Sequence, residues 1–138
     1  MTVYFIAPED AEEPVKIGFT AHPIKKRLRA LQCVSPLRLR VIATAEGGRD
    51  VEKRLHSIFA TGRLWGEWFK PCQTLRIAAE TTAKGKPLSA ERLDLLELLA
   101  LVRTYRNEAR QAFPWSHFDN LIDRCGLRDL VNAKLAEG

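Results

Sequence analysis

The sequence has few cysteines, and their positions do not suggest a shared site. Three occur among 138 residues, at Cys33, Cys72 and Cys125, with no CxxC pair and no Cys/His cluster. An odd number at such wide spacing argues against a disulfide framework and against a structural zinc site. We therefore expect reduced thiols and a cytoplasmic protein.

Long apolar runs are also scarce. The most apolar stretch, Leu93–Val102, contains Asp94 and Glu97, which argues against a membrane-spanning helix. The N-terminus has no basic segment followed by a long apolar one, so we expect no signal peptide. The leucines of Leu93–Val102 fall on more than one side of a helix, so the rest of its own domain, a second copy of the chain or a partner protein must cover it.

Apolar and basic residues are abundant by comparison. Hydrophobic residues make up 46% of the chain, which is enough for a core and argues against wholesale disorder. The 22 lysines and arginines outnumber the 17 acidic residues, giving a net charge of +5. This balance permits a polyanionic partner such as nucleic acid. The length suits one domain with a small appendage.

The first part of the chain alternates between strand and helix patterns. Apolar, β-branched and aromatic residues predict strands at Val3–Ile6 and Val15–Thr20, joined by a polar loop with two prolines. A helix is expected at Ile24–Gln32, a third strand at Leu37–Thr44 and a second helix at Val51–Phe59.

The remaining residues are expected to be helical after a short extended segment at Gly62–Phe69. Residues 74–83 predict a helix that closes the first domain. Ser89 can cap a long helix, and shorter ones are expected at 115–124 and 129–135. The sequence thus predicts a domain at residues 1–80, a polar linker at 81–88 and a helical C-terminal region at 89–138.

Two polar side chains interrupt the N-terminal strands. Tyr4 follows Val3, and Lys16 lies between Val15 and Ile17, so each faces away from its apolar neighbours. If the strands pair, the phenol and the ammonium could emerge on one face of the sheet. The alternative is a sheet with one ordinary solvated side.

The helices expected at Ile24–Gln32 and Val51–Phe59 also present polar candidates. Arg27 borders the apolar stripe of the first helix, where it either lays its stem on the core with its head in water or reaches over the sheet edge. Glu52 and His56 are four residues apart and are therefore neighbours on a helix surface. They form either a local carboxylate–imidazole pair or a metal-binding carboxylate with a second polar group beside it.

In their order and spacing, these residues resemble the GIY-YIG nuclease superfamily, most closely its short T5orf172-like branch in phage and bacterial proteins. The resemblance covers residues 1–80 and rests on Tyr4, Lys16-Ile17-Gly18, Arg27, Glu52-x-x-x-His56 and Gly66-Glu67-Trp68-Phe69. It implies an α+β fold with a small three-stranded antiparallel sheet flanked by helices. A phage-encoded member would act in the host cytoplasm.

The resemblance also implies a metal-dependent endonuclease that hydrolyses DNA. Glu52 would hold Mg²⁺ or Mn²⁺, because such ions prefer oxygen ligands and keep several waters. Arg27 would pair with the scissile phosphate. Tyr4 would be the general base or orient the water, and as a base it needs Lys16 or Arg27 to lower its pKa. His56 would assist the leaving group or orient Glu52.

A DNA substrate also calls for contacts to its other phosphates. Basic residues outside the motif either track those phosphates or form an ordinary solvated face; they are Lys25, Lys26, Arg29, Arg38, Arg40, Lys53 and Arg54. A second hypothesis is a catalytically weak nucleic-acid- or protein-binding module of the same fold, possible in phage–host interaction, whose C-terminal helices bind a partner. The intact set of Tyr4, Arg27 and Glu52 favours the enzyme.

Overall fold

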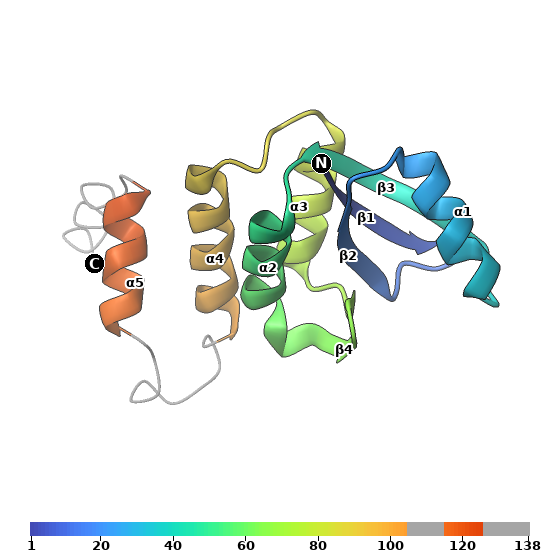
Figure 1. Ribbon diagram of the computed structural model, residues 1–138. Helices are drawn as coiled ribbons and strands as arrows, with labels where there is room; N and C mark the ends of the chain where they lie inside the picture. The colour runs from blue at the N-terminus through green and yellow to red at the C-terminus, as the bar shows by residue number, and fades with distance from the viewer. Residues whose placement is uncertain (105–114, 126–138) are drawn as a thin grey trace. The chain divides into compact units, whose positions relative to one another are not determined.

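The computed structural model describes residues 1–104 and 115–125. The chain divides into two compact units, the first ending at Leu88 and the second beginning at Ser89. Within the described ranges, the strands and helices α1 to α3 belong to the first unit, and helices α4 and α5 belong to the second (Figure 1). The helix expected at 129–135 lies outside the described residues.

The first unit is built on an antiparallel sheet of five strands in the order β3-β1-β2-β5-β4. The strands are β1 (Thr2–Pro8), β2 (Val15–Thr20), β3 (Leu39–Glu46), β4 (Arg63–Trp65) and β5 (Trp68–Phe69). The α+β class is as predicted, but the expected three-stranded sheet is wrong. The segment expected to be merely extended folds into a hairpin, β4–β5, which adds two strands beside β2.

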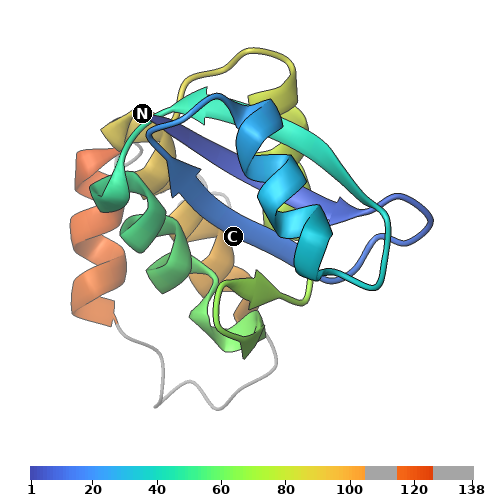
Figure 2. The same cartoon turned by 45° about the vertical axis from the view of Figure 1, so that its right-hand side comes forward.

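Helices cover both faces of this sheet (Figure 2). They are α1 (Ile24–Val34), α2 (Arg49–Ile58) and α3 (Gln73–Ala83). The apolar stripe of α1 packs on Tyr4, Ile6 and Leu39, and we call this side of the sheet the α1 face. On the opposite face, α3 packs along β3 and α2 lies against β2. The strand alternation therefore buries apolar side chains on both sides.

The helix expected at residues 74–83 is α3, so residues 81–83 of the expected linker form its last turn. In that turn the buried Thr82 donates its hydroxyl hydrogen to the Ala78 carbonyl at 2.7 Å. This bond satisfies the buried hydroxyl within the helix. Only residues 84–88 then separate α3 from the second unit.

The described part of the second unit consists of α4 (Ala90–Thr104) and α5 (Trp115–Arg124). As predicted, Ser89 caps α4: its Oγ accepts the backbone N–H of Arg92 at 3.2 Å. Leu98, Leu121 and Ile122 are buried together between the two helices. These contacts hold α4 against α5.

One stripe of α4 is exposed. Leu95, Leu99 and Val102 recur at helical spacing and are 39–47% exposed. A partner or second copy on this helix stays a prediction. No helix within the described ranges has the length and apolar character needed to cross a bilayer.

Candidate functional site

Tyr4 lies on the α1 face, beside Gly18. The two residues are cross-strand partners in β1 and β2. A Cβ at position 18 would overlap the phenol oxygen, so only glycine leaves room for the ring. Arg27 reaches from α1 over the sheet, and its Nε donates to the Tyr4 hydroxyl at 3.1 Å. Of the two orientations open to Arg27, the structure therefore has the one directed toward the sheet.

The phenol of Tyr4 is fully buried, and burial has the largest effect on its pKa. The hydrogen bond and the charge of Arg27 lower the pKa, but burial outweighs them and the pKa is raised above its ordinary value. The same hydrogen bond raises the pKa of Arg27. The expected cation is present, but Tyr4 keeps its proton at neutral pH.

Lys16 shares the α1 face with Tyr4. It is the cross-strand partner of Ile6, two residues beyond Tyr4, and only 8% of it is exposed. Its Nζ lies 2.8 Å from Oε2 of Glu67, in the turn between β4 and β5, and 5.6 Å from the centre of the Trp68 ring. The ammonium is thus neutralised by a carboxylate within the site.

Glu52 and His56 are anchored by the backbone of β2. On β2, only Val15 and Lys16 pair with β5, so the edge of β2 from Ile17 onward has no β5 partner. There His56 Nε2 donates to the Ile17 carbonyl at 2.7 Å, and the Phe19 N–H donates to the Glu52 carboxylate. Two side chains of α2 thus take positions that a longer β5 would occupy.

Glu52 is 8% exposed, and the pKa of its carboxyl group is raised. Burial is the main cause, and the negative charge of Glu67 adds to it. His56, the Phe19 hydrogen bond and Arg49 act in the opposite direction. Glu52 and Glu67 also interact electrostatically with Tyr4 and with Arg27. The five predicted catalytic residues, together with Glu67, therefore belong to one cluster.

Residues 1–84 match the model of the T5orf172 domain family. The chain belongs to this family. The T5orf172 domain is associated with a GIY-YIG-like nuclease fold, so the family expected from the motifs is confirmed. Comparisons with curated proteins and with solved structures gave no match.

The donor set of this T5orf172 domain fits a divalent ion that binds mainly through water and substrate. In residues 1–104 and 115–125, no three His, Cys, Asp or Glu side chains form a metal cage. Mg²⁺ requires no such cage, because one or two carboxylates, several waters and a substrate phosphate suffice. Glu52 is a buried carboxylate whose pKa the charge of Glu67 raises further, although Glu67 is itself paired with Lys16. A cation bound at Glu52 would offset both its burial and that repulsion.

Sequence reasoning missed Arg49 and left Glu67 without a role. Arg49 belongs to the first turn of α2, with its guanidinium 5.7 Å from the centre of the Phe19 ring, and its charge lowers the pKa of Glu52. The available signal was its spacing, since a residue three before Glu52 lies on the same helix face. Glu67 falls within the Gly66–Phe69 motif, but its pairing with Lys16 could not be predicted, because a hairpin turn brings the two side chains together.

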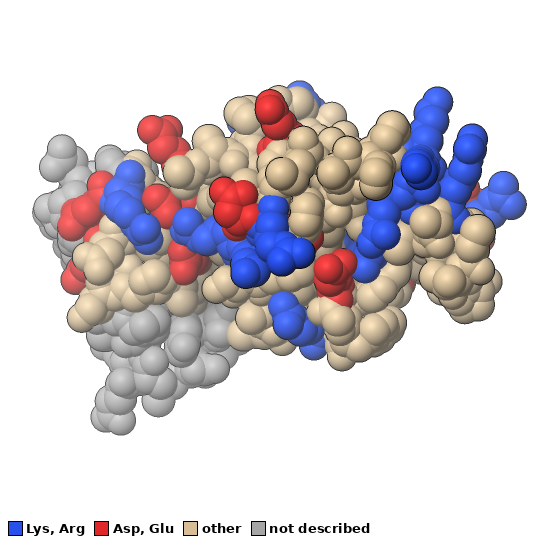
Figure 3. All heavy atoms as spheres, in the orientation of Figure 1, with Lys and Arg blue, Asp and Glu red and all other residues tan. Residues whose placement is uncertain are grey.

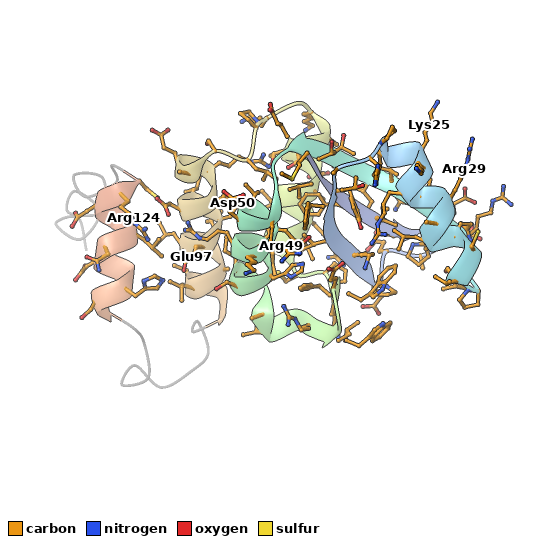
Figure 4. All side chains as sticks on the ribbon, in the orientation of Figure 1. Lys25, Arg29, Arg49, Asp50, Glu97 and Arg124 are labelled. Carbon is orange, nitrogen blue, oxygen red and sulfur yellow. The ribbon has the colours of Figure 1, made fainter. Side chains whose placement is uncertain are left out.

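The predicted phosphate-contacting residues do not form one continuous track. Lys25, Lys26 and Arg29 are exposed on α1, which carries no acidic residue. Basic side chains gather at this end of the first unit (Figure 3), and Lys25 and Arg29 extend away from the helix (Figure 4). The α1 group lies on the helix that supplies Arg27, so it is the one adjoining the site.

The other four predicted residues lie elsewhere. Arg38 is 3.7 Å from Glu9 in an exposed ion pair. Arg40 lines a groove with residues of α3, on the face opposite α1. Lys53 is exposed and Arg54 half-buried on α2. We therefore expect the α1 residues to contribute most to any contact with phosphates near the cluster.

Proposed function

We propose that this T5orf172 domain is a metal-dependent endonuclease that hydrolyses phosphodiester bonds in DNA. The observation that carries the proposal is the hydrogen bond from Arg27 to Tyr4, formed within the electrostatic reach of the buried Glu52. A structural role alone gives no reason to bury a carboxylate where the charge of a second carboxylate raises its pKa further. A reaction that needs a cation and an arginine around a phosphate does give one.

Arg27 is the residue we assign to the scissile phosphate. A guanidinium has five N–H donors, and Tyr4 takes only the one on Nε. The planar fork of the remaining donors matches two phosphate oxygens and can stabilise charge as it develops. Lys16 is paired with Glu67, so its contribution is to hold the β4–β5 turn beside the site.

For Tyr4 the structure favours orienting the attacking water over acting as a general base. A base must first lose its proton, and burial raises the phenol pKa. The hydroxyl oxygen accepts a hydrogen bond from Arg27, so its own hydrogen is not used in that contact. Because the hydroxyl is buried, the substrate must displace part of its cover before a water or a phosphate oxygen can accept that hydrogen. The role therefore requires a protonated Tyr4 held in place by Gly18 and Arg27.

Glu52 would hold the Mg²⁺ or Mn²⁺ ion. When bound, that ion supplies positive charge to the phosphate and to the water. The Phe19 N–H fixes the direction of the carboxylate, and His56 fixes the position of α2 through the Ile17 carbonyl. Since the Nε2 hydrogen is used in this bond, we assign His56 the orienting role and not that of leaving-group acid.

The test is a cleavage assay on single-stranded, duplex and branched DNA, with Mg²⁺, Mn²⁺ or EDTA. The wild type should cut with metal and not with EDTA. Glu52→Ala should cut about 1000-fold more slowly. Glu97→Ala, a glutamate-to-alanine change in the second unit, is the matched control and should stay within about twofold of the wild type.

Circular dichroism of each variant must show that it is folded. The proposal fails if the folded wild type cuts no DNA with either metal, or if Glu52→Ala cuts as fast as the wild type. Salt-sensitive DNA binding by a wild type that does not cut would instead support the binding-module hypothesis.

A further inference from the structure

The side chain of Trp65 is a large aromatic group that the core of the first unit does not use. It is 59% exposed on β4, the outermost strand of the sheet. Trp68, its cross-strand partner, is by contrast half-buried and packs on the cluster of Tyr4, Ile6 and Leu39. An isolated exposed tryptophan needs no explanation in itself, so its position relative to the site is what matters.

The register of the strands puts Trp65 on the same face as the catalytic cluster. Residues directly opposite each other on neighbouring strands point to the same side of a sheet. Lys16 is opposite Trp68, and Trp68 is opposite Trp65, so these three form a row across β2, β5 and β4. Since neighbouring strands are about 4.8 Å apart, Trp65 lies two strands, or roughly 10 Å, from Lys16.

The neighbours of Trp65 on β4 offer no second exposed aromatic ring. The guanidinium of Arg63 is 5.4 Å from the centre of the Phe69 ring, and Phe69 also contacts the His56 ring, 5.1 Å away between ring centres. Leu64 is 45% exposed, but it is not aromatic, and it is the extra residue at the register shift between β4 and β5, where strict alternation does not hold. Trp65 is therefore the exposed aromatic residue of β4 on the α1 face.

The charge on this face fits a nucleic-acid strand. α1 carries Lys25, Lys26, Arg27 and Arg29 and no acidic residue, so it favours a polyanion. A base next to a phosphate held at Arg27 would come within reach of Trp65. Every nucleobase has an aromatic face that stacks on tryptophan, but in a duplex both faces are already covered by neighbouring base pairs.

We propose that Trp65 stacks on an unpaired base of the DNA strand, so that the site takes single-stranded or locally unpaired DNA. The inference rests on the proposed function for the place of the phosphate at Arg27. It adds a base-stacking residue at the edge of the sheet, and it selects one strandedness among the possible DNA substrates.

The experiment measures binding and cutting separately. Binding of a labelled oligonucleotide of about 12 nucleotides, single-stranded or as a duplex, is followed by fluorescence anisotropy in EDTA. Trp65→Ala should weaken single-strand binding by roughly 5- to 100-fold and change duplex binding by less than about twofold. Trp65→Phe should keep most of the affinity, because it keeps an aromatic face.

Two controls separate stacking from general effects. Leu64→Ala, the adjacent exposed apolar residue, should leave both affinities unchanged. Lys25→Ala should weaken both forms alike and reduce the salt dependence of binding. Intrinsic fluorescence gives a direct readout, since single-stranded DNA should quench tryptophan emission in the wild type and much less in Trp65→Phe.

The proposal is overturned if Trp65→Ala binds single-stranded DNA as tightly as the wild type, or if it loses duplex binding to the same extent. The cleavage assay shows which claim has failed. Metal-dependent cutting that needs Glu52 but not Trp65 leaves the endonuclease standing without the stacking residue. If Trp65→Ala selectively loses single-strand binding but neither the wild type nor any variant cuts DNA, base stacking by Trp65 is supported and the endonuclease activity is rejected.

Discussion

Each unit of the protein has a glutamate beside a histidine, and the two pairs are held in different ways. In the second unit, His117 Nε2 lies 2.7 Å from Oε1 of Glu97, so the pair joins α4 to α5 directly. In the first unit, Glu52 and His56 share a face of α2, but each is bonded to the backbone of β2. The same two residue types thus form a link between helices in one place and part of the candidate site in the other.

The two pairs differ in the group that accepts a hydrogen bond from the histidine Nε2. Where the histidine bonds the glutamate, the carboxylate has a direct partner, and the contact serves helix packing. Where the histidine bonds a backbone carbonyl, the carboxylate stays buried beside another carboxylate and its pKa rises. A glutamate close to a histidine therefore does not indicate chemistry until the partner of each group is known.

The largest effect on this comparison should come from Gly18→Ala. Gly18 lies between Ile17 and Phe19, the two residues whose backbone anchors His56 and Glu52. The added Cβ overlaps the Tyr4 phenol, so we expect a loss of about 1–3 kcal/mol in unfolding free energy and about 100-fold in cleavage rate. Chemical denaturation and the cleavage assay measure the two losses.

Tyr4→Ala provides the control for this prediction. In a Tyr4→Ala background the ring is gone, so adding Ala at position 18 should cost much less stability than it does in the wild type. An equal cost in both backgrounds would show that the overlap with Tyr4 is not the cause.

A smaller effect, of opposite sign in the two units, should follow from replacing each glutamate with glutamine. A raised pKa means that the folded protein binds the Glu52 proton more tightly than the unfolded chain does, so ionised Glu52 destabilises the fold. Near pH 7 and in EDTA, Glu52→Gln should therefore raise the melting temperature by a few degrees. Glu97→Gln should lower it slightly, because it weakens the pair with His117.

The pH dependence gives the Glu52 prediction its control. Well below pH 4, under the ordinary pKa of a glutamate, Glu52 is protonated in both states and the gain from Glu52→Gln should vanish. Melting curves of the wild type and of Glu52→Gln at pH 7 and at the low pH measure this gain. The comparison would be contradicted if, at pH 7, Glu52→Gln and Glu97→Gln changed the melting temperature in the same direction.

The smallest effect should be the coupling between Glu97 and His117. A double-mutant cycle with alanine at each position should give roughly 0.2–1 kcal/mol, because the His117 side chain is 46% exposed and water and salt screen the pair. The coupling should fall as salt is added. A value that does not respond to salt would mean that packing, and not charge, joins these two side chains.

Much of this fold could be predicted from sequence patterns, because long elements leave a clear period. The strands at β1, β2 and β3 and the apolar stripe of α1 follow directly from alternation and helical spacing. β4 and β5 could not be predicted in this way, since three and two residues are too few to show a period. The sheet was therefore expected to have three strands.

The site was only partly predictable for a related reason. Tyr4 and Lys16 could be assigned to one face from alternation, and the register places them there. The partners of Glu52 and His56 could not be found, because they are backbone groups of Phe19 and Ile17, which no side-chain pattern reveals. The direction of the Tyr4 pKa depends on burial outweighing the charge of Arg27, which is decided by tertiary packing.

The shortness of β5 has one further consequence. A strand edge with unpaired backbone groups invites another chain to add a strand, which is a common route to aggregation. Here the Ile17 carbonyl and the Phe19 N–H are occupied by His56 and Glu52. The two side chains therefore also protect the molecule against intermolecular strand addition. Evolution at these positions would have to preserve solubility as well as any chemistry.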